Sequence, residues 1–223
     1  MADIDGGGAE DEKRVRLAEL ILRLRRAGVT DQRVVAAMEA TPRELFVPPE
    51  MRAEAYSERA LPIECGQTIS APVIVGMMTN ALDVHERDRV LEVGTGSGYQ
   101  AAVLARLCRR VYTIERFRTL TEAAEQRFRT LRIANITTLT ADGMNGWPEQ
   151  APFDRIIVTA AGETVPEALL KQVKVGGVIV MPVGSAEGIQ KLTRLERMED
   201  GFNERVLADV RFVPLIPGKA ARL

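Results

Sequence analysis

Carboxylates, hydroxyls and closely spaced glycines follow the predicted strands of this chain, and these residue types suit a nucleotide-like ligand. Three glycines stand at alternate positions after the apolar run 90–93: Gly94, Gly96 and Gly98. Glycines allow a sharp turn and let a ligand lie against the backbone. Glu92 precedes this turn, and Ser97 begins a predicted helix, 97–109, whose free N–H groups face it.

Further polar residues stand at the ends of later predicted strands: Glu115 after 111–114, Asp142 and Gly143 after 137–140, and Thr159 at the end of 153–159. Glu115 lies about twenty residues beyond the first glycine, the spacing at which an acidic residue accepts hydrogen bonds from ribose hydroxyls. Asp142 and its neighbouring backbone are expected to meet the amino edge of a purine. The alternative, that the glycines only pack a helix onto a strand, leaves Glu115 and Asp142 unexplained.

The sequence pattern of the turn reduces the number of nucleotide-like ligands that fit. Its Gly-x-Gly-x-Gly pattern differs from the Gly-x-Gly-x-x-Gly of dinucleotide-binding proteins, and no Gly-Lys-Ser/Thr stands ready for a triphosphate. A ligand with ribose and adenine but no phosphate needs no cation at the turn, and none is there. S-adenosylmethionine therefore fits these residues better than NAD or ATP.

The predicted elements alternate between strand and helix, which is typical of a doubly wound, mostly parallel α/β sheet. The predicted strands are 90–93, 111–114, 137–140, 153–159 and 178–181, the last after a turn at Gly176-Gly177, and the predicted helices are 97–109, 120–131 and 166–173. Ligands of such sheets bind at the carboxyl ends of the strands. Two helices, 11–27 and 30–41, are expected to form an N-terminal layer, and 190–197 with 204–213 an antiparallel C-terminal strand pair.

We divide the chain into a disordered tail (1–10), N-terminal helices with a lid (11–82), and an α/β core (83–223) that together form one catalytic unit. The segment 61–72 is rich in proline and glycine yet apolar, which favours a lid or binding loop. Ser70 stands two residues before Pro72, where a helix N-cap belongs. Capping is its simplest role, although a capping serine at the edge of a cleft also presents its hydroxyl to that cleft.

Composition excludes several other functions. Lys and Arg number 30 against 31 Asp and Glu, so the net charge of −1 lacks the basic excess of nucleic-acid-binding proteins. There is no membrane-length apolar run and no signal-peptide pattern. Cys65 and Cys108 make no metal-spaced pair, and the only histidine, His85, lies in a charged connector that suits no Ser-His or Cys-His nucleophile. We expect a cytoplasmic, metal-free monomer.

Motifs along most of the chain resemble a known family. Segment 91–100 resembles the first motif of class I S-adenosylmethionine-dependent methyltransferases, and 154–161 and 175–184 resemble their later motifs. More narrowly, the chain resembles the protein-L-isoaspartate O-methyltransferase family from about Leu17 to Leu215, with one small departure at Glu64-Cys65. The matching segments are 42–43, 46–47, 55–56, 61–63, 66–70 with Pro72, 92–100 and 211–215.

The resemblance implies methyl transfer from S-adenosylmethionine to the α-carboxylate of L-isoaspartyl residues in damaged proteins and peptides, followed by succinimide formation and hydrolysis partly to aspartate. It implies that Ser70 orients the acceptor carboxylate, that 61–69 forms the lid, and that Val213-Pro214 offers backbone to an extended substrate. A carboxylate is already ionised at neutral pH, so no general base is needed. The expected cofactor-binding residues are Thr68, Ser70, Glu92, Gly94, Gly96, Ser97, Gly98, Glu115, Asp142, Gly143 and Thr159.

Two rival functions remain open at this point. One is a class I methyltransferase that acts on another carboxylate acceptor. The other is a non-catalytic cofactor-binding domain, which would bind S-adenosylmethionine without transfer. An NAD oxidoreductase is weaker than either.

Overall fold

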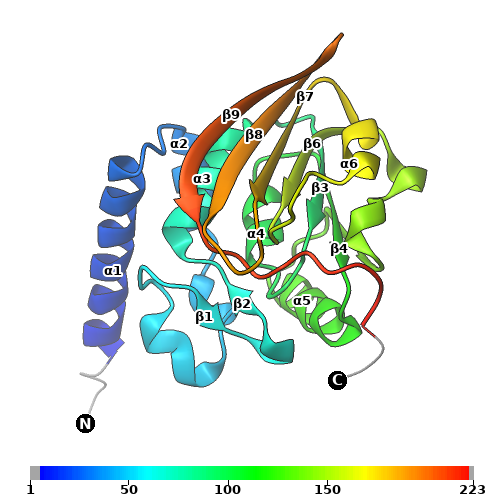
Figure 1. Ribbon diagram of the computed structural model, residues 1–223. Coiled ribbons are helices and arrows are strands. Elements are labelled where there is room, and N and C mark those ends of the chain that lie inside the picture. The colour runs from blue at the N-terminus through cyan, green and yellow to red at the C-terminus, as the bar shows by residue number, and fades with distance from the viewer. Residues whose placement is uncertain (1–5, 221–223) are drawn as a thin grey trace.

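The computed structural model describes residues 6–220, and its centre is a seven-stranded sheet (Figure 1). In spatial order the strands are β5 (Ile136–Thr140), β4 (Arg110–Glu115), β3 (Arg89–Val93), β6 (Phe153–Val158), β7 (Val173–Val183), β8 (Gln190–Met198) and β9 (Gly201–Val210). The strands from β5 to β7 are parallel, whereas β8 and β9 are antiparallel. The predicted fold class is therefore confirmed. Within this sheet the chain forms β3 first, then β4 and β5 toward one edge, and then β6 on the other side of β3. The strand order therefore reverses between β3 and β6, which is where such folds bind ligands.

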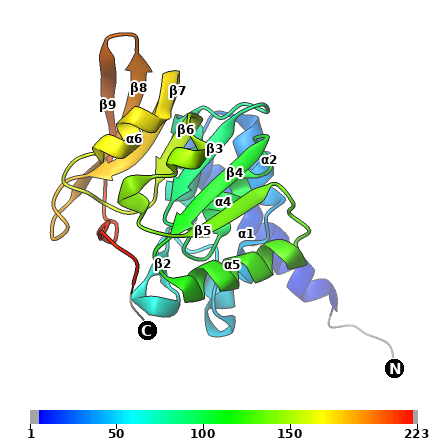
Figure 2. The same cartoon turned by 90° about the vertical axis from the view of Figure 1, so that its right-hand side faces the viewer.

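Helices cover both faces of the sheet (Figure 2). They are α1 (Gly6–Arg26), α2 (Gln32–Glu39), α3 (Pro72–Leu82), α4 (Tyr99–Leu104), α5 (Arg118–Thr130) and α6 (Glu167–Gln172). Successive strand residues point to opposite faces: Val90 packs in the core shared with α1 to α5, whereas Leu91 packs in the core that contains α6. The central strands β3 and β6 are thus buried on both sides, which explains their nearly continuous apolar sequences.

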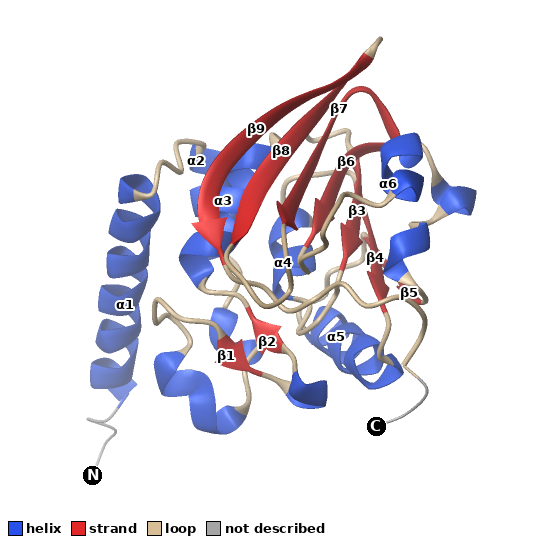
Figure 3. Cartoon of the chain, viewed as in Figure 1, coloured by secondary structure: helices blue, strands red, loops and turns tan. Residues whose placement is uncertain are grey.

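The lid segment folds into a small second sheet at the carboxyl ends of the parallel strands. β1 (Leu61–Pro62) pairs antiparallel with β2 (Thr68–Ile69), and Figure 3 shows this pair between α1 and α5. A single helical turn, Glu64–Gly66, joins the two strands. The C-terminal segment, red in Figure 1, then crosses the same end of the sheet.

Several boundaries differ from prediction at the N-terminal half. α1 begins at Gly6, so residues 6–10, which we expected to be disordered, are helical, while 1–5 lie outside the described residues. Each residue added to an existing helix gains one hydrogen bond for the one residue that becomes fixed, so extension is much less costly than starting a helix. The glycines 6–8 can therefore be helical as an extension of α1. α4 ends at Leu104 rather than Arg109. There the side chain of Asn135 donates to the carbonyl oxygens of Ala105 and Cys108 and so stabilises a non-helical path.

The C-terminal strands also differ from prediction. β7 runs through Gly176-Gly177, which we expected to form a turn. The pairing of β6 with β7 shifts register after Phe153, and a Cβ atom on Gly177 would lie 2.7 Å from the Asp154 carbonyl oxygen. The glycines therefore allow a bulge and a close backbone approach inside one long strand. The predicted hairpin is confirmed, although β9 ends at Val210 rather than Val213.

Candidate active site

A cavity opens at the carboxyl ends of the parallel strands, between the glycine turn, the lid and the C-terminal segment. Sequence-predicted residues that line it are Thr68, Ser70, Gly94, Gly96, Ser97, Glu115, Gly143, Thr159 and Val213. Residues from six separate parts of the chain thus meet at one edge of the sheet, where the α/β topology places ligand sites. Glu92, Gly98 and Asp142 do not line the cavity.

The glycine turn has a backbone conformation that residues with side chains rarely adopt. Gly94, Gly96 and Gly98 have φ angles of 99°, 51° and 88°, in the left-handed region that favours glycine. A Cβ atom on Gly94 would lie 2.3 Å from Thr159 Oγ1, and one on Gly98 would lie 2.8 Å from the Phe128 ring. A Cβ atom on Gly96 would lie 3.7 Å from Ile63 Cδ1, which is an ordinary van der Waals distance, so only its positive φ opposes a side chain there. Gly98 therefore serves packing, whereas Gly96 lines the cavity with bare backbone.

Glu115 both lines the cavity and holds the glycine turn. Its Oε2 accepts a hydrogen bond from Gly96 N–H at 2.8 Å, and its Oε1 accepts from Arg116 N–H at 2.8 Å and Phe117 N–H at 3.1 Å. Two carboxylate oxygens offer about four lone-pair sites, so one acceptor site is left for a ribose hydroxyl. Thr159 supports the same turn, because its hydroxyl donates to the Gly94 carbonyl at 2.7 Å.

Glu92 lies beneath the turn rather than in the cavity, which corrects its predicted role as a cofactor ligand. Its side chain is 0% exposed and points to the face opposite Leu91 and Val93. Oε2 accepts from Thr113 Oγ1 at 2.5 Å, while Oε1 has no hydrogen-bond partner. Burial, opposed by the Thr113 hydrogen bond and reinforced by the charge of Glu115, raises the pKa of Glu92 to about 8. The side chain is therefore a mostly neutral carboxylic acid at neutral pH.

This burial predicts how stability changes with pH. Between about pH 4.5, the ordinary pKa, and about pH 8, folded Glu92 holds a proton that the unfolded chain releases, so rising pH favours unfolding. Glu92→Gln mimics the neutral acid and removes this effect. We expect the free energy of unfolding of the unchanged protein to fall relative to Glu92→Gln as pH rises through this window, by at most about 1.4 kcal/mol per pH unit. Urea unfolding of both proteins from pH 5.5 to 8 checks this. Parallel pH profiles would contradict it.

Asp142 is the second predicted ligand that does not line the cavity. It is the N-cap of the short 3₁₀ helix Gly143–Asn145, and its Oδ1 accepts from Met144 N–H at 2.9 Å. Aspartate is favoured at such caps because it satisfies a free backbone donor. Gly143 does line the cavity, and a Cβ atom there would lie 2.4 Å from the Val93 side chain. Asp142 thus shapes the cavity wall without entering it.

Ser70 does not cap α3, contrary to the simplest prediction. The N-cap is Ala71, with no side-chain cap hydrogen bond, and Pro72 occupies the first helical position, where no donor needs a cap. The Ser70 hydroxyl makes no hydrogen bond to any other residue between 6 and 220, and the side chain is half-buried in the cavity wall. Its carbonyl oxygen accepts from Arg43 Nη2 at 2.6 Å. The hydroxyl is therefore available to a ligand.

A second cavity adjoins the first. Thr68, Ser70, Thr159 and Val213 line both cavities, and so form the boundary between them. The second cavity is otherwise walled by residues of the lid, α3 and the chain that leaves β9: Ala60, Ala71, Ile74, Asp209, Val210, Arg211 and Phe212. Two neighbouring compartments that share hydroxyl groups suit a transfer between two bound molecules.

Part of the Val213 backbone is already used inside the protein. Its carbonyl accepts from Ala161 N–H at 2.8 Å, and Leu215 N–H donates to the Ala161 carbonyl at 2.7 Å. The C-terminal segment thus forms a short parallel bridge after β6. The Val213 N–H donates to no group within the described part of the chain. Within residues 6–220, neither this N–H nor the Ser70 hydroxyl is occupied by a hydrogen bond, so both can bind a ligand.

Sequence reasoning missed several lining residues. They include Gln67, Tyr99, Gln100, Arg116, Phe117, Leu215 and Ile216. Arg116 and Phe117 directly follow Glu115 at the carboxyl end of β4, so their position could have been inferred from Glu115. Leu215 and Ile216 reach the cavity only because the C-terminal segment crosses the sheet, which no local pattern indicates.

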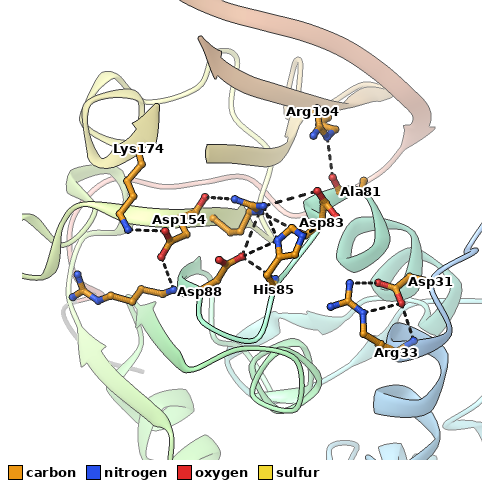
Figure 4. A network of polar contacts seen from close by, with 11 residues as sticks. Asp31, Arg33, Ala81, Asp83, His85, Asp88, Asp154, Lys174 and Arg194 are labelled. Atoms are coloured by element: carbon orange, nitrogen blue, oxygen red, sulfur yellow. Dashed lines mark hydrogen bonds and ion pairs between the residues drawn. The ribbon is translucent and has the colours of Figure 1, made fainter. Parts of the chain in front are cut away.

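The only histidine lies in a polar network at the amino ends of the strands (Figure 4). His85 Nδ1 is 3.0 Å from Arg155 Nη2, and the backbone N–H of His85 donates to Asp88 Oδ2 at 2.9 Å. Arg155 also donates to the Asp83 carbonyl at 2.8 Å. None of these residues lines either cavity. Among residues 6–220 no helix is long and apolar enough to cross a membrane, and no group of three or more His, Cys, Asp or Glu side chains could hold a metal ion.

Comparisons with known proteins place this geometry in a family. The family profile for protein-L-isoaspartate(D-aspartate) O-methyltransferase matches residues 15–220. A protein-L-isoaspartate O-methyltransferase from Parvibaculum lavamentivorans is 58% identical over 212 residues, which cover 94% of this chain and 96% of the relative. A solved protein-L-isoaspartate O-methyltransferase is 27% identical with a TM-score of 0.78, over 89% of this chain and 65% of that one.

A structure from Plasmodium falciparum, determined in complex with S-adenosyl-L-homocysteine, shares the fold with a TM-score of 0.76 and 24% identity, over 89% of this chain and 97% of that one. The resemblance seen in the motifs is therefore confirmed across nearly the whole length. With its glycine turn, lid and C-terminal segment assembled around one cavity, the chain belongs to the protein-L-isoaspartate(D-aspartate) O-methyltransferase family.

Proposed function

We propose that the protein transfers a methyl group from S-adenosylmethionine to the α-carboxylate of L-isoaspartyl residues in damaged proteins. The observation that carries this proposal is the pair of adjoining cavities that share Ser70, in a chain of this family. The first cavity, walled by the glycine turn and Glu115, takes the methyl donor. The second takes the peptide.

The residues of the first cavity fit S-adenosylmethionine. Gly96 lines the cavity with bare backbone, Glu115 keeps an acceptor site for a ribose hydroxyl, and the turn presents no cation that would call for a phosphate. When bound, S-adenosylmethionine supplies a methyl group already activated by its sulfonium. The chain's own residues then have to hold the acceptor and exclude water.

The acceptor carboxylate needs positioning rather than activation. A carboxyl with an ordinary pKa near about 4 is ionised at neutral pH, so its oxygen can form the new bond to the methyl carbon without losing a proton. In our proposal the Ser70 hydroxyl donates a hydrogen bond to one carboxylate oxygen and directs the other toward the first cavity. The Val213 N–H, which has no acceptor among residues 6–220, is a second candidate donor from a residue that lines both cavities. Such alignment can supply about 7–11 kcal/mol of the barrier.

Recognition of the peptide is expected to depend on main chain more than on side chains. The C-terminal segment already runs as an extended strand beside Ala161, and its outer edge borders the second cavity. An extended substrate could lie along that edge, although Pro214 lacks an N–H and Phe212 N–H is bound to Gln190. The strand-addition mode that the sequence suggested would therefore be limited to few backbone hydrogen bonds.

Labelled S-adenosylmethionine with a matched pair of peptides tests this proposal. An isoaspartyl peptide should become labelled, and its twin with a normal aspartyl residue should not. The labelled ester should then be lost as the succinimide forms, because the neighbouring amide nitrogen attacks the methyl ester. Equal labelling of both peptides would point to another acceptor. Binding of S-adenosylhomocysteine without labelling of either would point to a non-catalytic domain.

We also place the reaction in the cytoplasm and expect a monomer that binds neither nucleic acid nor membranes. Both cysteines, Cys65 and Cys108, are free thiols, which suits a reducing compartment. The nearly balanced charge of −1 offers no basic footprint for a nucleic acid or an anionic membrane surface.

A further inference from the structure

Arg43 is a charged side chain buried in the core directly behind the proposed acceptor site. It lies in the short 3₁₀ helix Arg43–Leu45 and is 0% exposed. Its Nη2 donates to the Ser70 carbonyl at 2.6 Å, and its Nε donates to the Ala55 carbonyl at 2.6 Å. One rigid guanidinium therefore fixes the position of Ser70 relative to the segment that leads into the lid.

The same guanidinium reaches the other side of the site. Its central carbon lies 4.7 Å from the centroid of the Tyr99 ring. Tyr99 is the first residue of α4, directly after Gly98 of the glycine turn, and its ring packs edge-on against Phe46 at 5.4 Å. Arg43 is thus in contact with both the Ser70 loop and the helix that the glycine turn begins.

This arrangement is costly for the fold. Arg43 forms no ion pair with an acidic side chain in the described part of the chain, and its Nη1 has no hydrogen-bond partner. Burial lowers the pKa of its guanidinium to about 10, so the side chain still carries its charge at neutral pH. Apolar residues of similar volume usually stabilise a core at least as well as a buried charge does. A role in placing Ser70 would account for an arginine here.

We propose that Arg43 is a positioning residue for methyl transfer, which holds Ser70 at the distance from the glycine turn that the reaction needs. The inference rests on the proposed function, because it requires Ser70 to face the acceptor carboxylate. Arg43 acts through the Ser70 backbone and touches neither substrate nor cofactor. Its removal should therefore affect the transfer step more than cofactor binding.

A double-mutant cycle separates this role from a merely structural one. We expect Arg43→Met to lower kcat by about 30-fold, because small displacements of a positioned group cost this much. S-adenosylhomocysteine should still bind within about threefold of the original affinity, as measured by calorimetry. In a Ser70→Ala background, Arg43→Met should lower kcat by less than about threefold, because residues that act as a unit are non-additive.

Two further variants keep the test decisive. Arg155→Met is the matched control, because Arg155 is also buried and donates to backbone carbonyls, but at the far end of the sheet; it should lower stability and leave kcat unchanged. Arg43→Lys keeps the charge but lacks the planar fork whose separate nitrogens donate to the two carbonyls, so it should lose kcat to an intermediate degree. If Arg43→Met fails to fold, the Lys variant with Ser70→Ala completes the cycle.

Three outcomes would overturn the proposal. They are an unchanged kcat in the Arg43 variants, full additivity with Ser70→Ala, and a loss of cofactor affinity that accounts for the whole decrease. Failure of the proposed function is read separately, since it would show as no methylation of the isoaspartyl peptide by the unchanged protein.

Discussion

Ser70→Ala should lower kcat for an isoaspartyl peptide by about 100-fold, the cost of losing alignment at the reacting atoms. The Ser70 hydroxyl borders both cavities and has no hydrogen-bond partner among residues 6–220, so its removal leaves no internal group unsatisfied. The fold should keep its stability, because no helix cap is lost. S-adenosylhomocysteine should bind with nearly unchanged affinity. Steady-state methylation with saturating cofactor, together with calorimetry, measures both quantities.

Ser57→Ala provides the matched control for this variant. Ser57 is also half-buried and its hydroxyl has no hydrogen-bond partner, but it lines neither cavity. Its replacement should leave turnover and affinity unchanged. If Ser70→Ala kept full turnover, or lost cofactor affinity instead of turnover, the acceptor-side role of Ser70 would be wrong.

Local patterns were sufficient for the framework of this site. Apolar strands, punctuating glycines and the acid after the second core strand, Glu115, predict which residues meet at the carboxyl edge, because the parallel topology brings every such strand end together. The glycine turn and Thr159 were found in this way. The loop containing Ser70 came instead from resemblance to a family, since irregular backbone has no periodicity to interpret.

The sequence did not predict where individual side chains of the site point. Glu92 lies one residue from Leu91 and from Val93, and strand alternation alone indicates that it faces away from both. Both faces of β3 lie under helices, so what could not be inferred is whether Glu92 packs beneath the turn or reaches the open carboxyl edge, which depends on tertiary packing. Asp142 could equally bind a ligand or cap a turn. Arg43 is the strongest case, because arginine is almost never fully buried and nothing local predicts it.

Glu115→Gln should raise the dissociation constant of S-adenosylhomocysteine by about 10- to 100-fold, which corresponds to the loss of one charge-assisted hydrogen bond. The carboxylate accepts from Gly96 N–H on one oxygen and from Arg116 and Phe117 N–H on the other. An amide offers only one acceptor oxygen, so in either orientation its NH₂ group opposes at least one backbone donor. The turn that carries Gly96 therefore loosens, and the acceptor site for ribose is weakened. Calorimetric titration measures the effect.

Glu92→Gln is the decisive comparison, because sequence reasoning assigned both acids to the cofactor and the structure separates them. Glu92 is already mostly neutral at pH 7, so an isosteric amide should keep cofactor affinity within about threefold. The two acids are near neighbours, on β3 and at the end of β4, and Glu92 lies beneath the turn that Glu115 holds. A general disturbance of the fold would impair both variants alike. Equal losses of affinity would therefore contradict the assignment of Glu115 as the cofactor's partner, whereas a loss confined to Glu115→Gln would support it, because only this carboxylate borders the cavity.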